Sequence, residues 1–289
     1  MNIEPKQHIA SIDHYTGVRE NERYAISQFY EQDNPEGAIL AQQIQGESYV
    51  AAGYVYPSAL DELGRLQPEL DRSRGDNVEY YIAAAKHPEM SPRNMGSLRV
   101  ITIPEGGSLE DLAAYRYSKD ILSDEVELLL QSLIAEHGRE GVKEICALAK
   151  TNEATSLVSF ELLREITQAA IREKSEEKWL ITFTSHAHDV FMRRYGASVM
   201  QQVGEPVPVD VGDERTSDEL RLVPTLIDPG HLLENILHDI QTTRVVTEKI
   251  RLSNTLVFMA DGLNESDIPA EVLEYIQRIK ETKQQKAAA

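Results

Sequence analysis

The chain has 289 residues, of which 41% are hydrophobic and 27% are charged. This balance is ordinary for a globular protein and excludes a chain that is disordered throughout. The net charge is −19. Residues 1–139 contain 23 acidic and 12 basic residues, residues 140–200 contain 9 acidic and 8 basic ones, and residues 201–289 contain 16 acidic and 9 basic ones. Because a nucleic-acid backbone requires a concentrated basic surface, which no segment supplies, nucleic acid is excluded as a partner.

The chain shows neither membrane-spanning nor secretory features. No apolar run approaches the roughly 20 residues that cross a bilayer, and the first residues, MNIEPKQHIASIDHY, lack the basic and apolar regions of a signal peptide. We therefore expect a cytoplasmic protein. The single cysteine, Cys146, excludes an intrachain disulfide and a cysteine-based metal cluster, so no metal site is expected.

The N-terminal third predicts helical segments followed by paired strands. Residues 1–45 are expected to be helical with interruptions and to pack on the core, because RYAISQFY and GAILAQQIQ place apolar residues three or four apart. Residues 47–60 fit either a strand or a helix. NVEYYIAAAKH (77–87) and GSLRVITIPEG (96–106) are rich in β-branched and aromatic residues, which predicts two adjacent strands.

The middle of the chain alternates helices and strands. A helix is expected at 123–138, where Ser123 is the N-cap and Gly138 ends the helix. A strand at 142–149 then precedes a long helix whose apolar residues recur at helical spacing, namely Leu162, Leu163, Ile166, Ala170 and Ile171. A strand at 178–185, a short helix at 188–196 and a last strand at 197–209 complete a mixed α/β layered sheet.

Beyond Asp210 the sequence predicts an acidic connector and a helical tail. One helix is expected to open with Asp228 and Pro229, another with Asp267 and Pro269, and a third to lie near 243–260. The chain is therefore divided into an N-terminal helical segment (1–45), a core (46–210) and an acidic helical extension (211–289).

The run from Val142 to Val209 resembles the second half of a GNAT acyltransferase, in particular through FMRRYGASVMQQVGEPV, an apolar helix that ends in an aromatic residue and glycine before a strand. Upstream, YYIAAAKHPEMSPRNMGSLRVITIPEG resembles the paired strands of acyl-homoserine-lactone synthases and long-chain N-acyl amino acid synthases, which carry an arginine at the position of Arg99. LDELGRLQPELDRSRGDNVEYYI resembles the segment before those strands, where an acidic residue like Asp71 stands. The resemblance implies a mixed, mainly antiparallel sheet flanked by helices.

The resemblance also implies an N-acyltransferase that moves an acyl group from a carrier-protein or coenzyme A thioester to a small amine, such as an amino acid, with no tightly bound cofactor. The segment KTNEATSLVS lacks the glycines that cradle a pyrophosphate and carries Glu153, whose charge repels one. This departure favours acyl carrier protein as the donor. It equally allows an alternative, a non-catalytic GNAT-like module that binds a protein partner through its acidic helical tail.

Glu144 is the candidate general base, because a carboxylate on a strand beside the acyl cleft can take a proton from an attacking amine. Side chains alternate along a strand, so Glu144, Cys146 and Leu148 are expected to share one face that contacts substrate. In the alternative interpretation, Glu144 forms an ion pair with Lys143 or Lys178. Arg99 is expected either to bind a substrate carboxylate or to pair with Asp71 or Glu144.

Each of the other candidate residues also has a purely structural explanation. Cys146 is more simply a buried packing residue than a nucleophile, and His186 and His188 lack the partners of a metal site. In the GNAT family a tyrosine at the position of Tyr195 protonates the leaving thiolate, although a tyrosine packed on the sheet is equally compatible. Thr155 and Ser156 cap the long helix, and together with Lys150 they are the expected contacts to the donor's phosphate.

Overall fold

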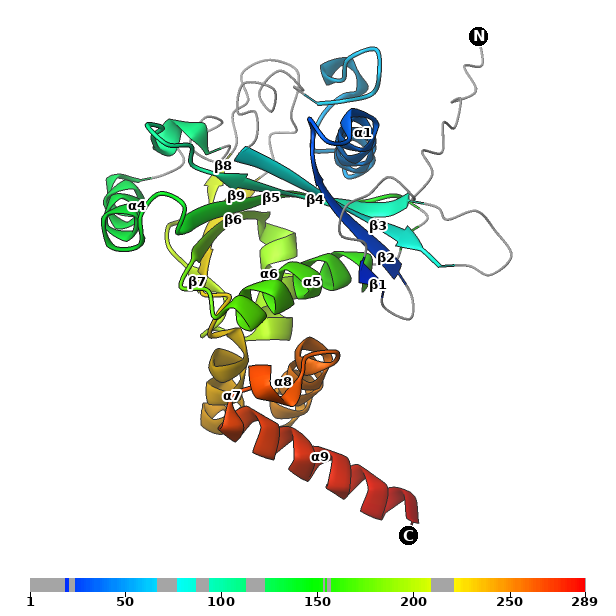
Figure 1. The fold of residues 1–289 in the computed structure, drawn as a ribbon, viewed down its shortest axis with the longest axis vertical. Coiled ribbons are helices and arrows are strands. Elements are labelled where there is room, and N and C mark those ends of the chain that lie inside the picture. Colours follow the sequence, from blue (N-terminus) through cyan, green and yellow to red (C-terminus); the bar gives the residue numbers. More distant parts are fainter. Residues whose placement is uncertain are drawn as a thin grey trace. The chain divides into compact units, whose positions relative to one another are not determined.

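The computed structural model describes residues 19–20, 24–66, 77–86, 94–112, 123–152, 154, 157–208 and 221–288. The chain divides into two compact units, the first formed by Met1–Val100 and Ala147–Leu162, and the second by Ile101–Cys146 and Leu163–Ala289. Figure 1 labels the elements of both. No helix in the described part of the chain is long and apolar enough to cross a membrane.

The first unit contains four strands and a helix, together with residues 147–162. Its strands are β1 (Arg19–Glu20), β2 (Tyr24–Tyr30), β3 (Val78–Ala85) and β4 (Asn94–Thr102). The two predicted strands are therefore confirmed as β3 and β4. The prediction of helix for RYAISQFY is wrong, because these residues form β2, which pairs with β3 from Tyr24↔Ala85 to Tyr30↔Glu79. Four consecutive residues of β2 are buried, so its apolar residues do not alternate and their spacing imitates that of a helix.

Helix α1 (Pro35–Ala51) confirms the helix predicted from GAILAQQIQ. Asn34 caps it by accepting a hydrogen bond from the Gly37 N–H at 2.9 Å. Gln42 then donates to the Tyr80 hydroxyl at 3.0 Å, which ties the helix to β3. For residues 47–60, where strand and helix were both open, the structure shows the end of α1 followed by the short 3-10 helix η2 (Pro57–Ala59).

The remaining strands complete a mixed sheet. They are β5 (Val142–Lys150), β6 (Lys178–Thr184), β7 (Gln201–Gln202), β8 (Val207–Pro208) and β9 (Arg221–Ile227). The strand order is β1-β2-β3-β4-β5-β6-β9-β7, with β8 also paired to β9. β5 and β6 are parallel, whereas β6, β7 and β8 each pair antiparallel with β9. The predicted fold class, a mixed and mainly antiparallel sheet flanked by helices, is confirmed.

The last strand of the sheet is not where the sequence predicted it. Residues 197–209 contribute only the two-residue strands β7 and β8, and the long neighbour of β6 is β9 at Arg221–Ile227. β9 follows the polar connector and pairs with six residues of β6, from Trp179↔Ile227 to Thr184↔Leu222. Pro224 lies within β9, and a proline inside an apolar run argues against a paired strand when only the sequence is read.

Helices cover both faces of the β5–β6 pair. Helix α4 (Asp124–His137) buries Val126 and Leu130 against Leu180 of β6, in a cluster that also includes Leu109 of the 3-10 helix η4 (Leu109–Asp111). Its predicted ends are confirmed, with Ser123 as N-cap and Gly138 after the last turn at a φ of 77°. Helices α5 (Leu157–Glu173) and α6 (Ser185–Tyr195) line the opposite face, where Trp179 and Ile181 point (Figure 1).

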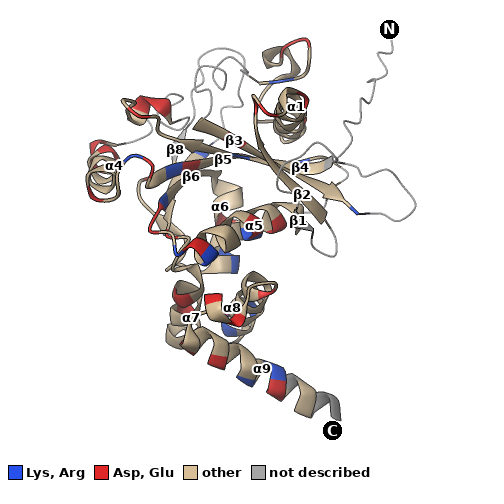
Figure 2. Cartoon of the chain, viewed as in Figure 1, with Lys and Arg blue, Asp and Glu red and all other residues tan. Residues whose placement is uncertain are grey.

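The tail contains the three predicted helices, α7 (Leu232–Thr242), α8 (Val246–Ala260) and α9 (Ala270–Ala288), with a 3-10 turn η5 at Glu265–Asp267. Both signs of charge occur along α9 (Figure 2). Helix α7 begins later than predicted, because Asp228 is not its cap. Instead, the Asp228 carboxylate accepts from Lys178 Nζ at 2.5 Å, which joins the end of β9 to the start of β6.

Candidate functional site

Glu144 lies on β5, deep inside the second unit, with 1% of its surface exposed. Its register partner on the parallel strand β6 is Leu180, and neighbouring residues in register point to the same face. Leu180 packs against α4, so Glu144 points to the α4 face of the sheet. A carboxylate buried at this depth requires polar contacts, because removal from water disfavours its charged form.

The parallel pairing of β5 with β6 ends one residue beyond Glu144, at Ile145↔Ile181. Residues 182–184 of β6 continue to pair with β9 on the other side. Their backbone groups that point away from β9 therefore have no strand partner among the described residues. An edge of this kind can bind an extended chain through main-chain hydrogen bonds.

β5 has an irregular backbone just after this point. Ala147 has a φ of 51°, in the left-handed region that residues other than glycine rarely adopt. The burial pattern changes phase slightly earlier, between Glu144 and Ile145, since Val142 and Glu144 are buried on one alternation and Ile145, Ala147 and Ala149 on the other. Such a shift is typical of a β-bulge. Glu144 is buried whereas Cys146 and Leu148 are half-buried, and the irregular backbone of Ala147 separates the last two, so one shared face for all three residues stays a prediction.

Thr182 is a polar residue on the same face that the sequence interpretation did not single out. It follows Leu180 by two positions on β6, so its side chain points to the face of Glu144. Its hydroxyl oxygen is buried and has no hydrogen-bond partner within the described part of the chain. Buried hydroxyls are almost always satisfied, so this one indicates a position for a bound water or a ligand atom. The sequence feature that could have indicated this polar face is the pair of threonines two positions apart in KWLITFT, Thr182 and Thr184.

The predicted alternative partners of Glu144 form other ion pairs. Lys143 Nζ lies 2.6 Å from Glu177 Oε1, and Lys178 Nζ lies 2.5 Å from Asp228 Oδ2. Both lysines offered as alternative partners of Glu144 therefore have other carboxylates as partners. Burial raises the pKa of Asp228, but its hydrogen bonds with Lys178 and His231 outweigh this effect and the pKa lies below its ordinary value.

Tyr195 is buried at the end of α6, with 3% of its surface exposed. Its ring stacks on Phe191, at a centroid distance of 5.9 Å and an interplanar angle of 2°. The apolar residues around it include Trp179 and Ile181, which point to the face opposite Leu180. The structure therefore does not bring Tyr195 and Glu144 together, because they lie on opposite faces of the sheet.

Three candidates belong to the first unit. Arg99 on β4 is buried, with 6% of its surface exposed, and Leu148 on β5 is half-buried. Lys150 Nζ donates to the Ala154 carbonyl at 3.1 Å and so closes the turn after β5. Asp71, Thr155 and Ser156, for which substrate or phosphate contacts were predicted, lie outside the described residues.

The histidine pair separates into one exposed and one buried residue on α6, His186 and His188. Thr184 caps the helix by accepting from the Ala187 N–H at 3.3 Å. Burial lowers the pKa of His188, against a smaller opposing effect of Asp189. Its ring lies 6.3 Å from that of Phe183, so it is part of the apolar layer under β6. Within the described residues, no group of three or more His, Cys, Asp or Glu side chains could hold a metal ion.

Two hollows in the second unit are lined by described residues other than Glu144. One of about 350 Å³ is lined by the residues around η4 and α4, including Ser108, Glu127 and Arg139. Another, of about 10 Å³, adjoins Tyr195 and is too small for more than a single water.

No protein-family model matches the sequence, and no curated protein matches it. Among solved structures the chain is similar to FeeM, an N-acyl amino acid synthase from uncultured soil microbes, at 14% identity, over 76% of this chain and 99% of that one, with a TM-score of 0.48. It is also similar to the AHL synthase LasI, at 9% identity over 74% of this chain and 91% of that one, with a TM-score of 0.44. A third similar structure is that of BjaI, a CoA-dependent acyl-homoserine lactone synthase, at 10% identity over 81% of this chain and 89% of that one, with a TM-score of 0.45.

Proposed function

We propose that this chain is an N-acyltransferase that transfers an acyl group from a carrier-protein or coenzyme A thioester to a small amine, such as an amino acid. The observation that carries this proposal is the buried carboxylate of Glu144, which lies one residue before the parallel pairing of β5 and β6 ends. A proton acceptor thus adjoins a strand edge that can bind an extended thioester arm.

In the proposed reaction the amine nitrogen attacks the thioester carbonyl, a C–N bond forms and the C–S bond breaks. Amines are protonated near neutral pH, so a base must take up a proton before or during the attack. Glu144 accepts that proton, with the Thr182 hydroxyl holding a water on the same face as a relay. The departing thiolate takes up a proton from solvent or a side chain, which balances the reaction.

Arg99 is the proposed anchor for a carboxylate on the amine acceptor. It is buried on β4, and a guanidinium can hold a carboxylate through two parallel hydrogen bonds. Cys146 and Leu148 are the proposed contacts to the acyl chain, whereas Lys150, Thr155 and Ser156 are the proposed contacts to the donor's phosphate. The alternative, a non-catalytic module that binds a protein partner, predicts that none of these residues affects any transfer reaction.

The function is tested by incubating the full chain with an acyl thioester of coenzyme A or of acyl carrier protein and a mixture of amino acids. Release of free thiol and N-acylated product are measured together by absorbance and mass spectrometry. We expect product, and a fall of about 10² to 10⁴ in rate for Glu144→Gln, which keeps the size of the side chain but removes its basicity. Absence of product with both donors, or full activity in Glu144→Gln with an unchanged melting curve, would overturn the proposal.

A further inference from the structure

The imidazole of His188 is buried on α6 with one ring nitrogen unsatisfied. Only 6% of its surface is exposed, and Nε2 has no hydrogen-bond partner within the described part of the chain. The His188 ring lies 6.3 Å from that of Phe183, which in turn lies 5.1 Å from that of Phe191. A neutral imidazole can pack in such an aromatic layer, whereas an imidazolium needs acceptors for two N–H groups. The surroundings of His188 therefore favour its neutral form.

The first half of α6 depends on this one side chain for its packing. Three residues of the helix are buried, namely His188, Phe191 and Tyr195. Within residues 185–190 only His188 is among them, and the other five residues are exposed or half-buried. A change in the charge of His188 therefore acts on the single buried contact of this half of the helix.

The two halves of α6 are attached to the rest of the second unit by different contacts. In the second half, Tyr195 stacks on Phe191 and the Arg194 carbonyl accepts from Thr255 Oγ1 of α8 at 3.0 Å. The first half has the cap that Thr184 provides at 3.3 Å and a bond from Ser185 Oγ to the Arg221 carbonyl at 3.4 Å. Both of these hydrogen bonds are long. The first half can therefore open while the second half stays attached.

One carboxylate favours a proton on His188, and its effect is the smaller one. Asp189 exerts the only appreciable charge effect on the His188 pKa within the described residues, and it raises that pKa. Burial lowers the pKa by more, so its value in the folded chain lies below the ordinary 6.5. The charged residue of β6, against which α6 packs, is Lys178 at the far end of the strand, where it is bound to Asp228.

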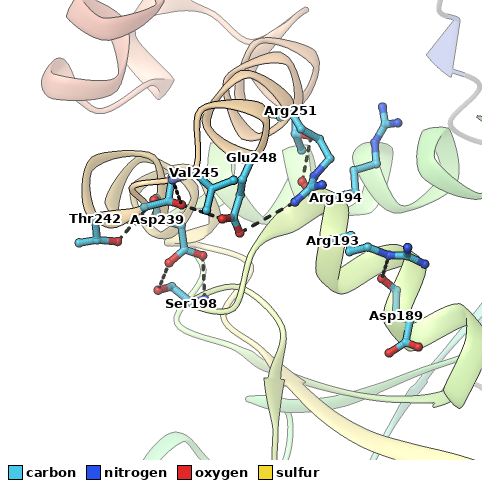
Figure 3. Close-up of polar contacts among 11 residues, drawn as sticks. Asp189, Arg193, Arg194, Ser198, Asp239, Thr242, Val245, Glu248 and Arg251 are labelled. Carbon is cyan, nitrogen blue, oxygen red and sulfur yellow. Dashed lines mark hydrogen bonds and ion pairs between the residues drawn. The ribbon is translucent and has the colours of Figure 1, made fainter.

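The other elements that pack on α6 are β9 and α8, and they add mainly cations. The charged residue of β9 is Arg221, and those of α8 are Glu248, Lys249 and Arg251. The Glu248 carboxylate accepts from Thr243 Oγ1 at 2.6 Å and lies 3.9 Å from Arg251 Nη2, so its charge is used within the tail (Figure 3). These elements therefore do not compensate for a positive charge on His188.

We propose that His188 is a pH-sensitive switch, which holds residues 185–190 against β6 as a neutral imidazole and releases them as an imidazolium. In the released form the imidazolium reaches water and the exposed Asp189 carboxylate. Release also uncovers Phe183, which is 4% exposed in the closed form, so uptake of one proton is coupled to exposure of an aromatic surface on β6. The switch is a property of the fold and requires no acyl-transfer activity.

The direction of the pH dependence follows from the two forms of the helix. In the open form His188 titrates near its ordinary value of 6.5, and in the closed form it titrates lower. Above 6.5 both forms are neutral and closure is at its most stable. As the pH falls through 6.5, the open form binds a proton that the closed form does not bind, so opening increases. Between pH 7.5 and pH 5.5 the opening equilibrium constant should rise by up to about tenfold.

Hydrogen exchange of the full chain, followed by mass spectrometry at pH 7.5 and 5.5 and corrected for intrinsic exchange rates, measures this constant. We expect it to rise for residues 185–190 and to stay constant for β9, which contains no histidine. His188→Leu and His188→Gln cannot take up the proton, so both should lose the rise. His186→Gln is the matched control, because His186 is exposed on the same helix, and this variant should keep the rise.

The outcomes separate a local switch from general acid unfolding. No rise in the unaltered chain, or an equal rise in His188→Leu, would overturn the proposal, and so would an equal rise in β9. Leucine is apolar and glutamine is polar, so one variant serves if the other fails to fold. Titration of the His188 ring in the unaltered chain by NMR needs no variant at this position. We expect a pKa below 6.5 there, and a value at or above 6.5 would also overturn the proposal.

Discussion

Ser198 donates two hydrogen bonds to the Asp239 carboxylate, from its backbone N–H at 2.9 Å and from its hydroxyl at 2.6 Å (Figure 3). The pair joins the turn after α6 to α7, 41 residues further along the chain. Gly196 leaves room for it, because a Cβ there would lie 2.2 Å from Asp239 Oδ2, and its φ of 97° also requires glycine. The turn and α7 are thus held by a specific polar contact as well as by apolar packing.

Replacing Asp239 with alanine should therefore weaken the attachment of α7. Hydrogen bonds to a charged group stabilise by about 1.5 to 3 kcal/mol, and partial exposure of this pair reduces that figure to about 1 kcal/mol in the free energy of unfolding. Chemical denaturation measures the change. Glu234→Ala, on the same helix and also half-buried, is the control and should change stability by less than about 0.5 kcal/mol. Equal losses in the two variants would refute a special role for the pair.

A second prediction concerns the boundary proposed at residue 210. A chain ending at Val211 lacks β9, so all six β6 residues that pair with it would lose their antiparallel partner. The exposed strand edge and the uncovered apolar layer should abolish the cooperative melt and promote aggregation. A chain ending at Lys280 is the control, because it keeps β9 and the buried α9 residues Val272 and Ile276 and should melt normally. A cooperative melt for the shorter chain would instead show that residues 1–211 fold without the tail.

A third prediction tests the left-handed backbone of Ala147 in β5. A left-handed conformation costs an L-residue about 1 to 2 kcal/mol, so Ala147→Gly should raise the free energy of unfolding by up to about 1 kcal/mol after the entropic cost of glycine is subtracted. Ala149→Gly in the same strand has no positive φ to relieve and should lower it by about 1 kcal/mol. Urea denaturation of both variants decides the matter. Destabilisation of similar size in both would mean that Ala147 stores no strain.

A fourth prediction follows from the bond between Asp228 and Lys178. The Asp228 pKa is depressed in the folded state, so the unfolded chain binds more protons at low pH. This stabilisation is complete above the ordinary aspartate pKa of about 3.9 and is lost as pH falls through the lower folded value. The stability difference between the unaltered chain and Asp228→Asn should hence be constant from pH 7 to about 4 and shrink below that. A difference that does not depend on pH would contradict the assignment.

Much of the fold could be predicted because its amphipathic elements keep their periodicity. α4 and the three tail helices bury one face and expose the other, and Ser123, Gly138 and Gly196 mark ends that local chemistry determines. β2 was predicted wrongly because both of its faces are buried and periodicity disappears. β9 was missed because its partner β6 lies far away in sequence, and only tertiary pairing accommodates Pro224 in a strand.

The candidate site was less accessible than the fold. Glu144 could be found because a charge within an apolar strand is conspicuous in any sequence. The faces of the residues after it could not be assigned, because neither the change in burial phase at Ile145 nor the positive φ of Ala147 has a sequence signal such as glycine. Thr182 was missed for a different reason: threonine is common in strands, and only the buried, unpartnered hydroxyl within the described residues distinguishes it.

The last prediction concerns Tyr195, for which the GNAT resemblance implies protonation of the leaving thiolate. Its place on the face opposite Glu144 and its stacking on Phe191 instead predict a packing role. Tyr195→Phe keeps the ring, so the rate of acyl transfer should stay within about twofold of the unaltered chain, whereas Tyr195→Ala should lower the free energy of unfolding by about 3 to 5 kcal/mol. Rates are compared for two thioesters, one with an alkyl thiol and one with an aryl thiol as leaving group. An acid that protonates the thiolate matters for the poorer leaving group alone. A large loss of rate in Tyr195→Phe with the alkyl thioester, restored with the aryl thioester, would show that Tyr195 is the acid and that the packing interpretation is wrong.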